Sequence, residues 1–211
     1  MKNKVEAIYQ KLFSHFGPQH WWPGDTPFEV AVGAILTQNT NWGNVEKAIR
    51  NLKKEGSLNH SALHHMSLAK LASLIRPAGY FNIKARRLKN FLNFCLLEYG
   101  GRMEKMKKED AEVIRRKLLT VNGIGPETAD SIALYALGKP FFVIDAYTKR
   151  VLSRHNIVEH EASYEAFQGL FHAMLENDVA LFNEYHALFV RVGKEHCRTT
   201  PLCGDCPLRG V

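Results

Sequence analysis

One carboxylate and a glycine-rich turn shortly before it are the features of this sequence best suited to carry out chemistry. Asp145 directly precedes the segment AYTKR, and an acid at that position caps a helix by accepting hydrogen bonds from its first N–H groups. These N–H groups and the helix dipole keep the acid ionised. A fixed negative charge can stabilise positive charge that develops on a substrate, or orient a water molecule. The alternative is an acid that only caps its helix.

The turn comprises residues 121–125, VNGIG, and lies between two expected helices. Asp110 caps the first helix, 111–119, while Pro126 opens the second helix and Gly138 ends it. We expect both glycines to adopt backbone angles, or to allow close approaches, that a β-carbon would forbid. N–H groups at such a helix start bind a phosphate oxygen without a lysine. An ordinary tight turn between helices is the alternative.

Aromatic side chains form another group of candidates. A loop near the N-terminus carries Trp21, Trp22 and Pro23, and Trp42 follows the polar residues 39–41. Two adjacent tryptophans before Pro-Gly do not both face one core, so at least one is expected to line a surface or a cleft. Tryptophans that simply fill the core are the alternative.

Three of the four cysteines, Cys197, Cys203 and Cys206, fall within the last fifteen residues. This crowding predicts a metal cluster in a reducing compartment rather than a set of disulfides. Together with His196 the three thiolates could also hold zinc. Cys95 instead falls among the apolar positions of a long helix, so we expect it to be a core residue.

Apolar residues that recur every three or four positions predict helices along the chain. The expected helices cover residues 5–16, 27–36, 45–52, 68–75, 82–99, 111–119, 126–137, 163–174 and 178–192. Apolar alternation never extends beyond a few residues, so the predicted fold class is all-α. On helix 82–99, Lys84, Arg86, Arg87 and Lys89 predict a solvated face.

The composition is that of a globular protein, with 211 residues of which 45% are hydrophobic and 23% charged. Neither a signal peptide nor a long apolar segment is found, so we expect a cytoplasmic protein, associated with the nucleoid if the source is bacterial. We also expect it to be a monomer. A formal net charge of +7 favours a polyanionic partner, although many basic proteins bind no nucleic acid.

Residues 118–151 join this turn to a Gly138-Lys139-Pro140 loop, an apolar run at 141–144 and the capping Asp145. In this order they resemble the helix-hairpin-helix, Gly/Pro-loop, aspartate motif of the DNA base-excision glycosylases, the endonuclease III-like HhH-GPD superfamily. The resemblance implies a base excision repair enzyme that flips a damaged base out of double-stranded DNA. It makes Asp145 the catalytic residue, a carboxylate beside the sugar of the extruded nucleotide.

The resemblance also implies two helical lobes with a DNA-binding groove between them. One lobe is formed by residues 25–137, and the other by residues 1–24 together with residues 138–211. The residues expected at the DNA lie around the hairpin and the C-terminal loop: Gln38, Asn122, Gly123, Ile124, Gly125, Thr128, Lys194 and Arg198. Gln38 matches the position that, in relatives, inserts into the gap left by the extruded base, with a simple helix-end amide as the alternative.

Position 127 separates two classes of enzyme within this superfamily. Members that also cut the DNA strand carry a lysine two residues after the second glycine of the hairpin, and its amine attacks the sugar. This chain has Glu127 there, and a glutamate cannot form a Schiff base. The resemblance therefore implies a monofunctional glycosylase without lyase activity, although Lys139 or Lys149 could in principle replace the missing amine.

The tryptophans resemble the base pocket of the 3-methyladenine DNA glycosylases of endonuclease III type, in which a flipped alkylated purine is stacked between aromatic rings. A cationic alkylated purine is attracted to flat π faces by stacking and cation–π forces. Trp21, Trp22, Pro23 and Trp42 would form this pocket, although Trp42 stands where that group can carry phenylalanine. The alternatives are an endonuclease III-type glycosylase for oxidised or mismatched pyrimidines, and a non-catalytic DNA-binding protein.

The C-terminal segment resembles the 4Fe–4S loop of the same superfamily, with Cys197, Cys203 and Cys206 as ligands. It departs from the family pattern in two ways, because the first spacing is one residue shorter than usual and a fourth cysteine is absent. A 4Fe–4S cluster is the expected cofactor, with zinc or no metal as the alternatives.

Overall fold

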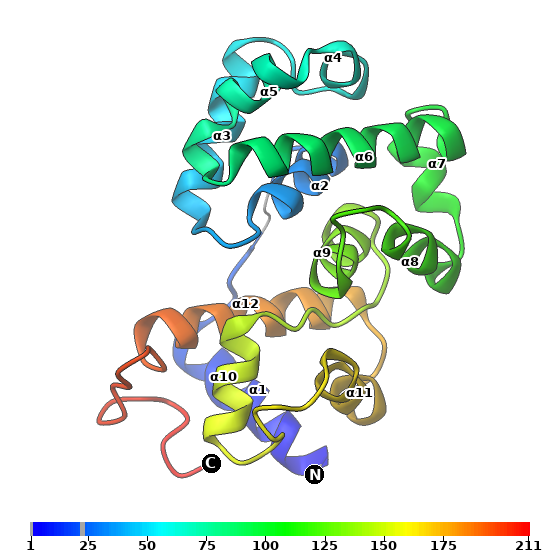
Figure 1. Cartoon of the computed structure of the whole chain (residues 1–211). Coiled ribbons are helices and arrows are strands. Elements are labelled where there is room, and N and C mark those ends of the chain that lie inside the picture. The colour runs from blue at the N-terminus through cyan, green and yellow to red at the C-terminus, as the bar shows by residue number, and fades with distance from the viewer. Residues whose placement is uncertain (1, 22–23) are drawn as a thin grey trace. The chain divides into compact units, whose positions relative to one another are not determined.

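The structure is a computed structural model that describes residues 2–21 and 24–211. Trp22 and Pro23, two of the residues expected in the base pocket, lie outside the described residues. Every regular element in the described ranges is helical, which confirms the predicted all-α fold class (Figure 1). Within these ranges, none of the helices combines the length and the apolar composition needed to span a bilayer.

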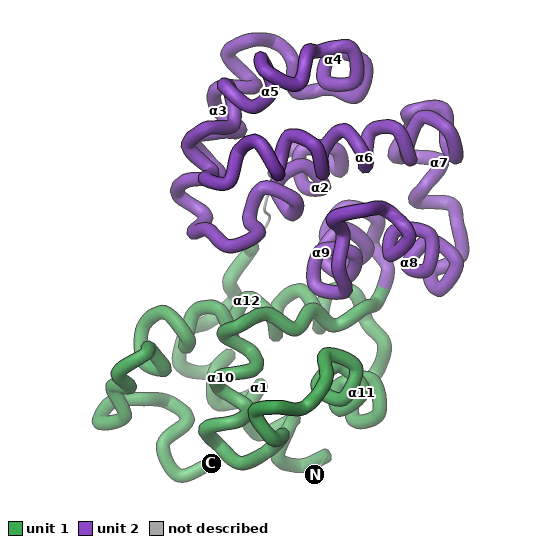
Figure 2. The backbone as a smooth tube through the Cα atoms, viewed as in Figure 1, with its two compact units in different colours: residues 1–21, 140–211 green, residues 22–139 purple. Residues whose placement is uncertain are grey.

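The chain divides into two compact units (Figure 2). We call residues 22–139 the central unit, and residues 1–21 together with 140–211 the terminal unit. The turn at 121–125 and Trp42 belong to the central unit, whereas Asp145, Trp21 and the three C-terminal cysteines belong to the terminal unit.

The central unit is built around α2, a helix that is buried on nearly every side. Thr26 caps it by accepting a hydrogen bond from the Glu29 N–H, and Pro27 occupies its first turn, as the sequence predicts. Its neighbours include α3, α6 and η2. The elements of this unit are α2 Pro27–Leu36, α3 Trp42–Lys54, α4 His60–His65, α5 Leu68–Leu74, η1 Arg76–Ala78, α6 Phe81–Tyr99, α7 Met103–Lys108, α8 Ala111–Leu119, α9 Pro126–Ser131 and η2 Ile132–Ala136.

The helix predicted over residues 126–137 is divided into α9 and the π-helical turn η2. The N–H of Leu137 donates to the carbonyl of Ile132, five residues earlier, at 3.1 Å. An apolar period of 3.6 residues in the sequence does not distinguish such a local widening from a regular helix. Cys95 on α6 is buried, as expected for a core residue.

The prediction of a solvated basic face on α6 is wrong for three of its four residues. Lys84 is 1% exposed, and its Nζ donates to the carbonyls of Leu36 at 2.9 Å and Ala78 at 2.7 Å. Lys89 donates to the carbonyls at the end of α4, and the half-buried Arg87 contacts the turn. Only Arg86 is exposed. The ends of short helices leave carbonyls without partners, and these long side chains satisfy them.

The terminal unit packs α12 against α10 and α1 around an aromatic core. The rings of Phe142 and Phe171 stack with centroids 3.6 Å apart, and Phe182 and Tyr185 meet Phe142 edge-on. The hydroxyl of Tyr185 also donates to the Val5 carbonyl at 2.7 Å, which ties α12 to α1. The helices of this unit are α1 Lys2–Phe16, α10 Ala146–Arg154, α11 Tyr164–Met174 and α12 Val179–Glu195.

Lys84 gives the stability of the fold a distinctive pH dependence. Burial first, and then the positive charge of Arg87, lower the pKa of Lys84 from 10.5 to about 8. Between these two values the unfolded chain binds more protons than the folded one, so the contribution of Lys84 to stability rises with pH. We expect the difference in unfolding free energy between the wild type and Lys84→Met to grow by roughly 1 kcal/mol per pH unit from pH 8 to 10.

Urea unfolding at several pH values measures this difference. Arg86→Met is the matched control because Arg86 lies on the same helix and is exposed. A difference for Lys84→Met that is constant over the window would contradict the expected ionisation.

Candidate active site

Asp145 lies at the N-terminus of α10, where its carboxylate caps the helix as predicted. Its Oδ1 accepts a hydrogen bond from the Thr148 N–H at 2.7 Å, and its backbone is extended, with φ −97° and ψ 179°. The Asp145 side chain is 14% exposed. One carboxylate oxygen is therefore held by the helix, and the second is available for other contacts.

The second oxygen of Asp145 faces a histidine that the sequence analysis did not identify. Oδ2 lies 3.6 Å from Nε2 of His186 on α12, and His186 is 4% exposed. The ring of Trp21 stacks on the His186 ring with centroids 5.4 Å apart and an interplanar angle of 16°. His186 falls between Phe182 and Phe189 on the buried face of α12, so a histidine among apolar positions was the signal in the sequence.

The surroundings of Asp145 favour its ionised form. Burial raises the pKa of this carboxyl. The interactions with His186 and with the N–H of Thr148 lower the pKa, and together they outweigh the effect of burial. The net result is a pKa below the ordinary value of 3.8. Asp145 is thus a carboxylate at neutral pH, and it can stabilise positive charge nearby.

The two glycines of the turn have different roles in the structure. Gly123 has a φ of +94°, and a Cβ placed there would lie 2.3 Å from Cγ of Arg87. Gly125 has an extended backbone with φ −91°, and a Cβ there would meet nothing within 4 Å. The expectation that both positions exclude a β-carbon is therefore wrong for Gly125, whose conformation is open to any residue.

Two carbonyls of the turn accept hydrogen bonds from side chains outside it. The Asn122 carbonyl accepts from Nδ2 of Asn90 at 3.0 Å, and the Gly123 carbonyl accepts from Nε2 of Gln38 at 2.9 Å. In a trans peptide the C=O and the next N–H point in opposite directions, so the N–H of Gly123 is directed away from Asn90. Throughout the described residues, no acceptor is within hydrogen-bond reach of the N–H groups of Gly123 and Gly125.

Gln38 links the end of α2 to the turn through hydrogen bonds. Besides Gly123, its amide nitrogen donates to Oγ1 of Thr128 at 2.9 Å, and its oxygen accepts from Nη1 of Arg87 at 2.5 Å. Thr128 is almost fully buried in this arrangement. Insertion of Gln38 into a DNA gap stays a prediction, and it requires that these contacts be exchanged.

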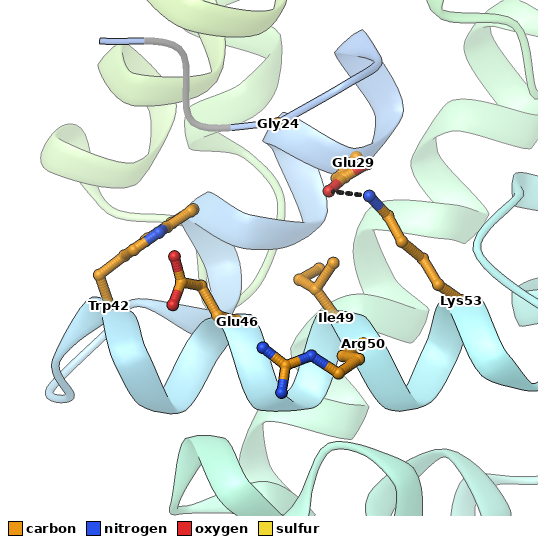
Figure 3. Close-up of a pocket in the computed structure, with 7 residues that line it drawn as sticks. All are labelled: Gly24, Glu29, Trp42, Glu46, Ile49, Arg50 and Lys53. Carbon is orange, nitrogen blue, oxygen red and sulfur yellow. Dashed lines mark ion pairs between the residues drawn. The ribbon is translucent and has the colours of Figure 1, made fainter.

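A hollow in the central unit brings Trp42 together with carboxylates (Figure 3). Its volume is about 380 Å³, and its lining is Gly24, Glu29, Trp42, Glu46, Ile49, Arg50 and Lys53. In Figure 3 the Trp42 ring and the Glu46 carboxylate both point from α3 toward α2. One face of α3 carries Trp42, Glu46, Ile49 and Lys53. Their helical spacing was the signal in the sequence for this group.

The charges at this hollow are only partly compensated. The buried Glu29 pairs with Nζ of Lys53 at 2.8 Å, and Lys53 also pairs with the exposed Asp25 at 2.7 Å. Among the described residues, none forms an ion pair with Glu46. The Trp42 face and the Glu46 carboxylate can attract a flat cationic group, although the cation Arg50 also lines the hollow.

The three C-terminal cysteines lie near one another, because the thiols of Cys197 and Cys203 add to the effect of burial in raising the pKa of Cys206. Cys197 is buried, Cys203 is exposed and Cys206 is half-buried. In the described part of the chain, no three His, Cys, Asp or Glu side chains are placed to hold a metal ion. The 4Fe–4S cluster with these three ligands, and the zinc alternative, therefore stay predictions.

Local packing explains this arrangement of the C-terminal loop. Nε of Arg150 donates to the Cys197 carbonyl at 2.6 Å, and Arg154 donates to the Thr199 carbonyl at 2.9 Å and to Sγ of Cys197 at 3.5 Å. The His196 ring lies against the rings of α1, with centroids 6.0 Å from His15. Arginine donors thus hold the loop that was expected to wrap a metal.

The remaining predicted residues have separate locations. Lys194 and Arg198 are both exposed, and Nε of Arg198 donates to the Lys194 carbonyl at 2.9 Å. Glu127 lies in the first turn of α9. Of the two lysines that could replace a nucleophile there, Lys139 donates to the Glu109 carbonyl at 2.6 Å, and Nζ of Lys149 lies 5.5 Å from the ring centre of Phe167.

Residues 32–176 match the family described as HhH-GPD superfamily base excision DNA repair protein. The chain belongs to this superfamily. It is 47% identical to a Methanocaldococcus jannaschii protein named as a candidate DNA repair glycosylase, over 99% of this chain and 96% of that one. This membership supports the resemblance seen in the motif around Asp145.

Solved structures agree with this assignment. The H. pylori 3-methyladenine DNA glycosylase MagIII, bound to 1,N6-ethenoadenine, is 30% identical with a TM-score of 0.77, covering 92% of this chain and 97% of that one. A trapped endonuclease III–DNA covalent intermediate reaches a TM-score of 0.85 at 20% identity, covering 99% of this chain and 93% of that one. The second similarity shows the shared fold alone.

The unequal glycines of the turn predict unequal effects on stability. Gly123→Ala places a β-carbon at a positive φ and against Arg87, so we expect it to lower the unfolding free energy by about 1–2 kcal/mol. Gly125→Ala is the matched control, and its effect should stay within about 0.5 kcal/mol. Urea unfolding of both variants measures the difference, and equal losses would show that the turn is not shaped as described.

Proposed function

We propose that this protein is a monofunctional DNA glycosylase that releases an alkylated purine such as 3-methyladenine. Membership of the HhH-GPD superfamily supports the release of a base from DNA. The observation that carries the choice of substrate is the hollow in which the Trp42 ring lies beside the Glu46 carboxylate. N3-alkylated adenine is a flat cation, so stacking and charge both favour it over a neutral base.

The proposed reaction uses the ionised Asp145. A cationic base is already a good leaving group, so the C1′–N bond breaks with little acid catalysis, and positive charge develops on the sugar. The Asp145 carboxylate stabilises this charge or orients the attacking water, which gives up a proton as the new C1′–O bond forms. Its pKa below the ordinary range keeps it ready for this role.

The proposed DNA contacts follow from the exposed donors of the turn. The N–H groups of Gly123 and Gly125 bind a phosphate oxygen, and Asn122, Ile124 and Thr128 shape the turn that presents them. Lys194 and Arg198, both exposed, add positive charge for the DNA backbone. Gln38 keeps its predicted role in the gap left by the flipped base.

Further support for an alkylated purine comes from the solved MagIII structure, which is that of a 3-methyladenine DNA glycosylase holding an ethenoadenine. Trp21, with Trp22 and Pro23, keeps its predicted role in stacking the base. The proposed lack of lyase activity rests on Glu127 and on the contacts that occupy Lys139 and Lys149.

A panel of damaged duplexes tests the proposed substrate. We expect single-turnover release of 3-methyladenine to be faster than release of thymine glycol or of thymine from a G·T mismatch. Preferential release of thymine glycol would favour an endonuclease III-type enzyme instead. Release from none of the duplexes would favour a DNA-binding protein without catalysis.

Asp145→Asn tests the assigned catalytic role within the same panel. It removes the negative charge but keeps an oxygen that can cap α10, so we expect base release to fall by about 10²- to 10³-fold while DNA affinity is retained. Asp178→Asn, which changes the cap of α12, is the matched control. An Asp145→Asn variant as active as the wild type would exclude the carboxylate from the reaction.

Borohydride trapping tests the predicted absence of lyase activity. A Schiff base between an amine and the sugar would be reduced to a stable protein–DNA adduct, and we expect none from the wild type. Glu127→Lys is the informative companion, because it restores the amine at the position that strand-cutting members use. An adduct formed by the wild type would show that another amine acts as nucleophile.

A further inference from the structure

The geometry points to His186 as the positioning residue of this active site, which fixes the Asp145 carboxylate and couples it to the ring of Trp21. The inference rests on the proposed function, since it assigns a role within the same reaction. All three residues belong to the terminal unit, so the cluster is complete within one compact body.

The helix cap alone does not fix the orientation of the Asp145 carboxylate. The Thr148 N–H binds Oδ1, so the position of Oδ2 depends on other contacts. His186 supplies the second point of contact, because its Nε2 lies 3.6 Å from the other oxygen. Two partners on different helices define the plane of the carboxylate, and a reaction that stabilises charge at one carbon atom depends on that plane.

The fold holds the His186 ring firmly in place. His186 lies on the buried face of α12, where the neighbouring Tyr185 is anchored through its hydroxyl to Val5. A Cβ at Gly193 would lie 2.5 Å from Cδ1 of Tyr147, so the glycine lets α10 and α12 approach closely. A buried imidazole needs a polar partner, and the Asp145 carboxylate provides one.

Trp21 sets the plane of the imidazole. The two rings are nearly parallel, at 16°, so the aromatic ring supports one face of His186 while an edge nitrogen meets Asp145. The contact needs a proton on Nε2 of His186, so that this edge of the ring faces the Asp145 carboxylate as a donor. A side chain expected to stack the base is therefore connected to the acid through one intervening ring.

Two substitutions separate positioning from packing. His186→Phe keeps a flat ring against Trp21 but removes the nitrogen, whereas His186→Gln keeps an amide donor of similar reach. We expect His186→Phe to slow single-turnover base release by roughly 10- to 100-fold, and His186→Gln to restore much of the loss. Affinity for a duplex with an abasic-site analogue should be unchanged in both variants, and His160→Phe is the exposed control.

Tryptophan fluorescence gives a second readout that needs no substrate. Replacing His186 by Gln should change the tryptophan emission of the wild type. It should not change the emission of a Trp21→Phe background, because that background lacks the tryptophan that stacks on His186. This comparison tests the contact between Trp21 and His186 even if no duplex releases a base. Failure to release any base would contradict the proposed function but not this contact.

Base release at the wild-type rate by His186→Phe would overturn the inference. So would equal rate losses in the Phe and Gln variants, since packing rather than a directed nitrogen would then explain both. Thermal unfolding of each variant shows that the compared samples are folded.

Discussion

A carboxylate that is largely buried yet ionised is the constraint on which the rest of this structure depends. Burial disfavours the charge of Asp145, and the fold offsets this with the Thr148 N–H at the start of α10 and the imidazole of His186 on α12. The His186 contact requires that the two helices meet closely, which the absence of a side chain at Gly193 permits. The chemistry proposed for the protein is thus built into the packing of α10 on α12.

In the central unit, side chains satisfy backbone carbonyls that lack partners. Short helices end in carbonyls without partners, and Lys84 and Lys89 reach them from α6. Gln38 binds the Gly123 carbonyl, and Asn90 binds the Asn122 carbonyl, which directs the next N–H, that of Gly123, away from Asn90. The Asn90 hydrogen bond therefore both stabilises the turn and orients one donor, the Gly123 N–H, that a phosphate oxygen could bind.

The sequence predicted well those features that local chemistry decides. The caps at Asp110 and Asp145 each depend on a few consecutive residues, and the structure confirms both of them. The all-α fold class follows from apolar periodicity, which is also a local signal.

Features decided by tertiary contacts were predicted poorly. A lysine is normally solvated, so nothing in the pattern of α6 indicates that Lys84 is buried against the carbonyls of two other helices. His186 and Glu46 gain their significance only from the residues that the fold places beside them. The cysteine spacing gave no sign that the arginines of α10 bind the carbonyls of that loop.

The most direct test of the central claim compares two abasic-site analogues in duplex DNA, a cationic pyrrolidine and a neutral tetrahydrofuran. If the Asp145 carboxylate stabilises positive charge on the sugar, the wild type should bind the pyrrolidine duplex about tenfold or more tightly than the tetrahydrofuran duplex, and Asp145→Asn should lose this preference. An equal preference for the cation in the wild type and in Asp145→Asn would contradict the account.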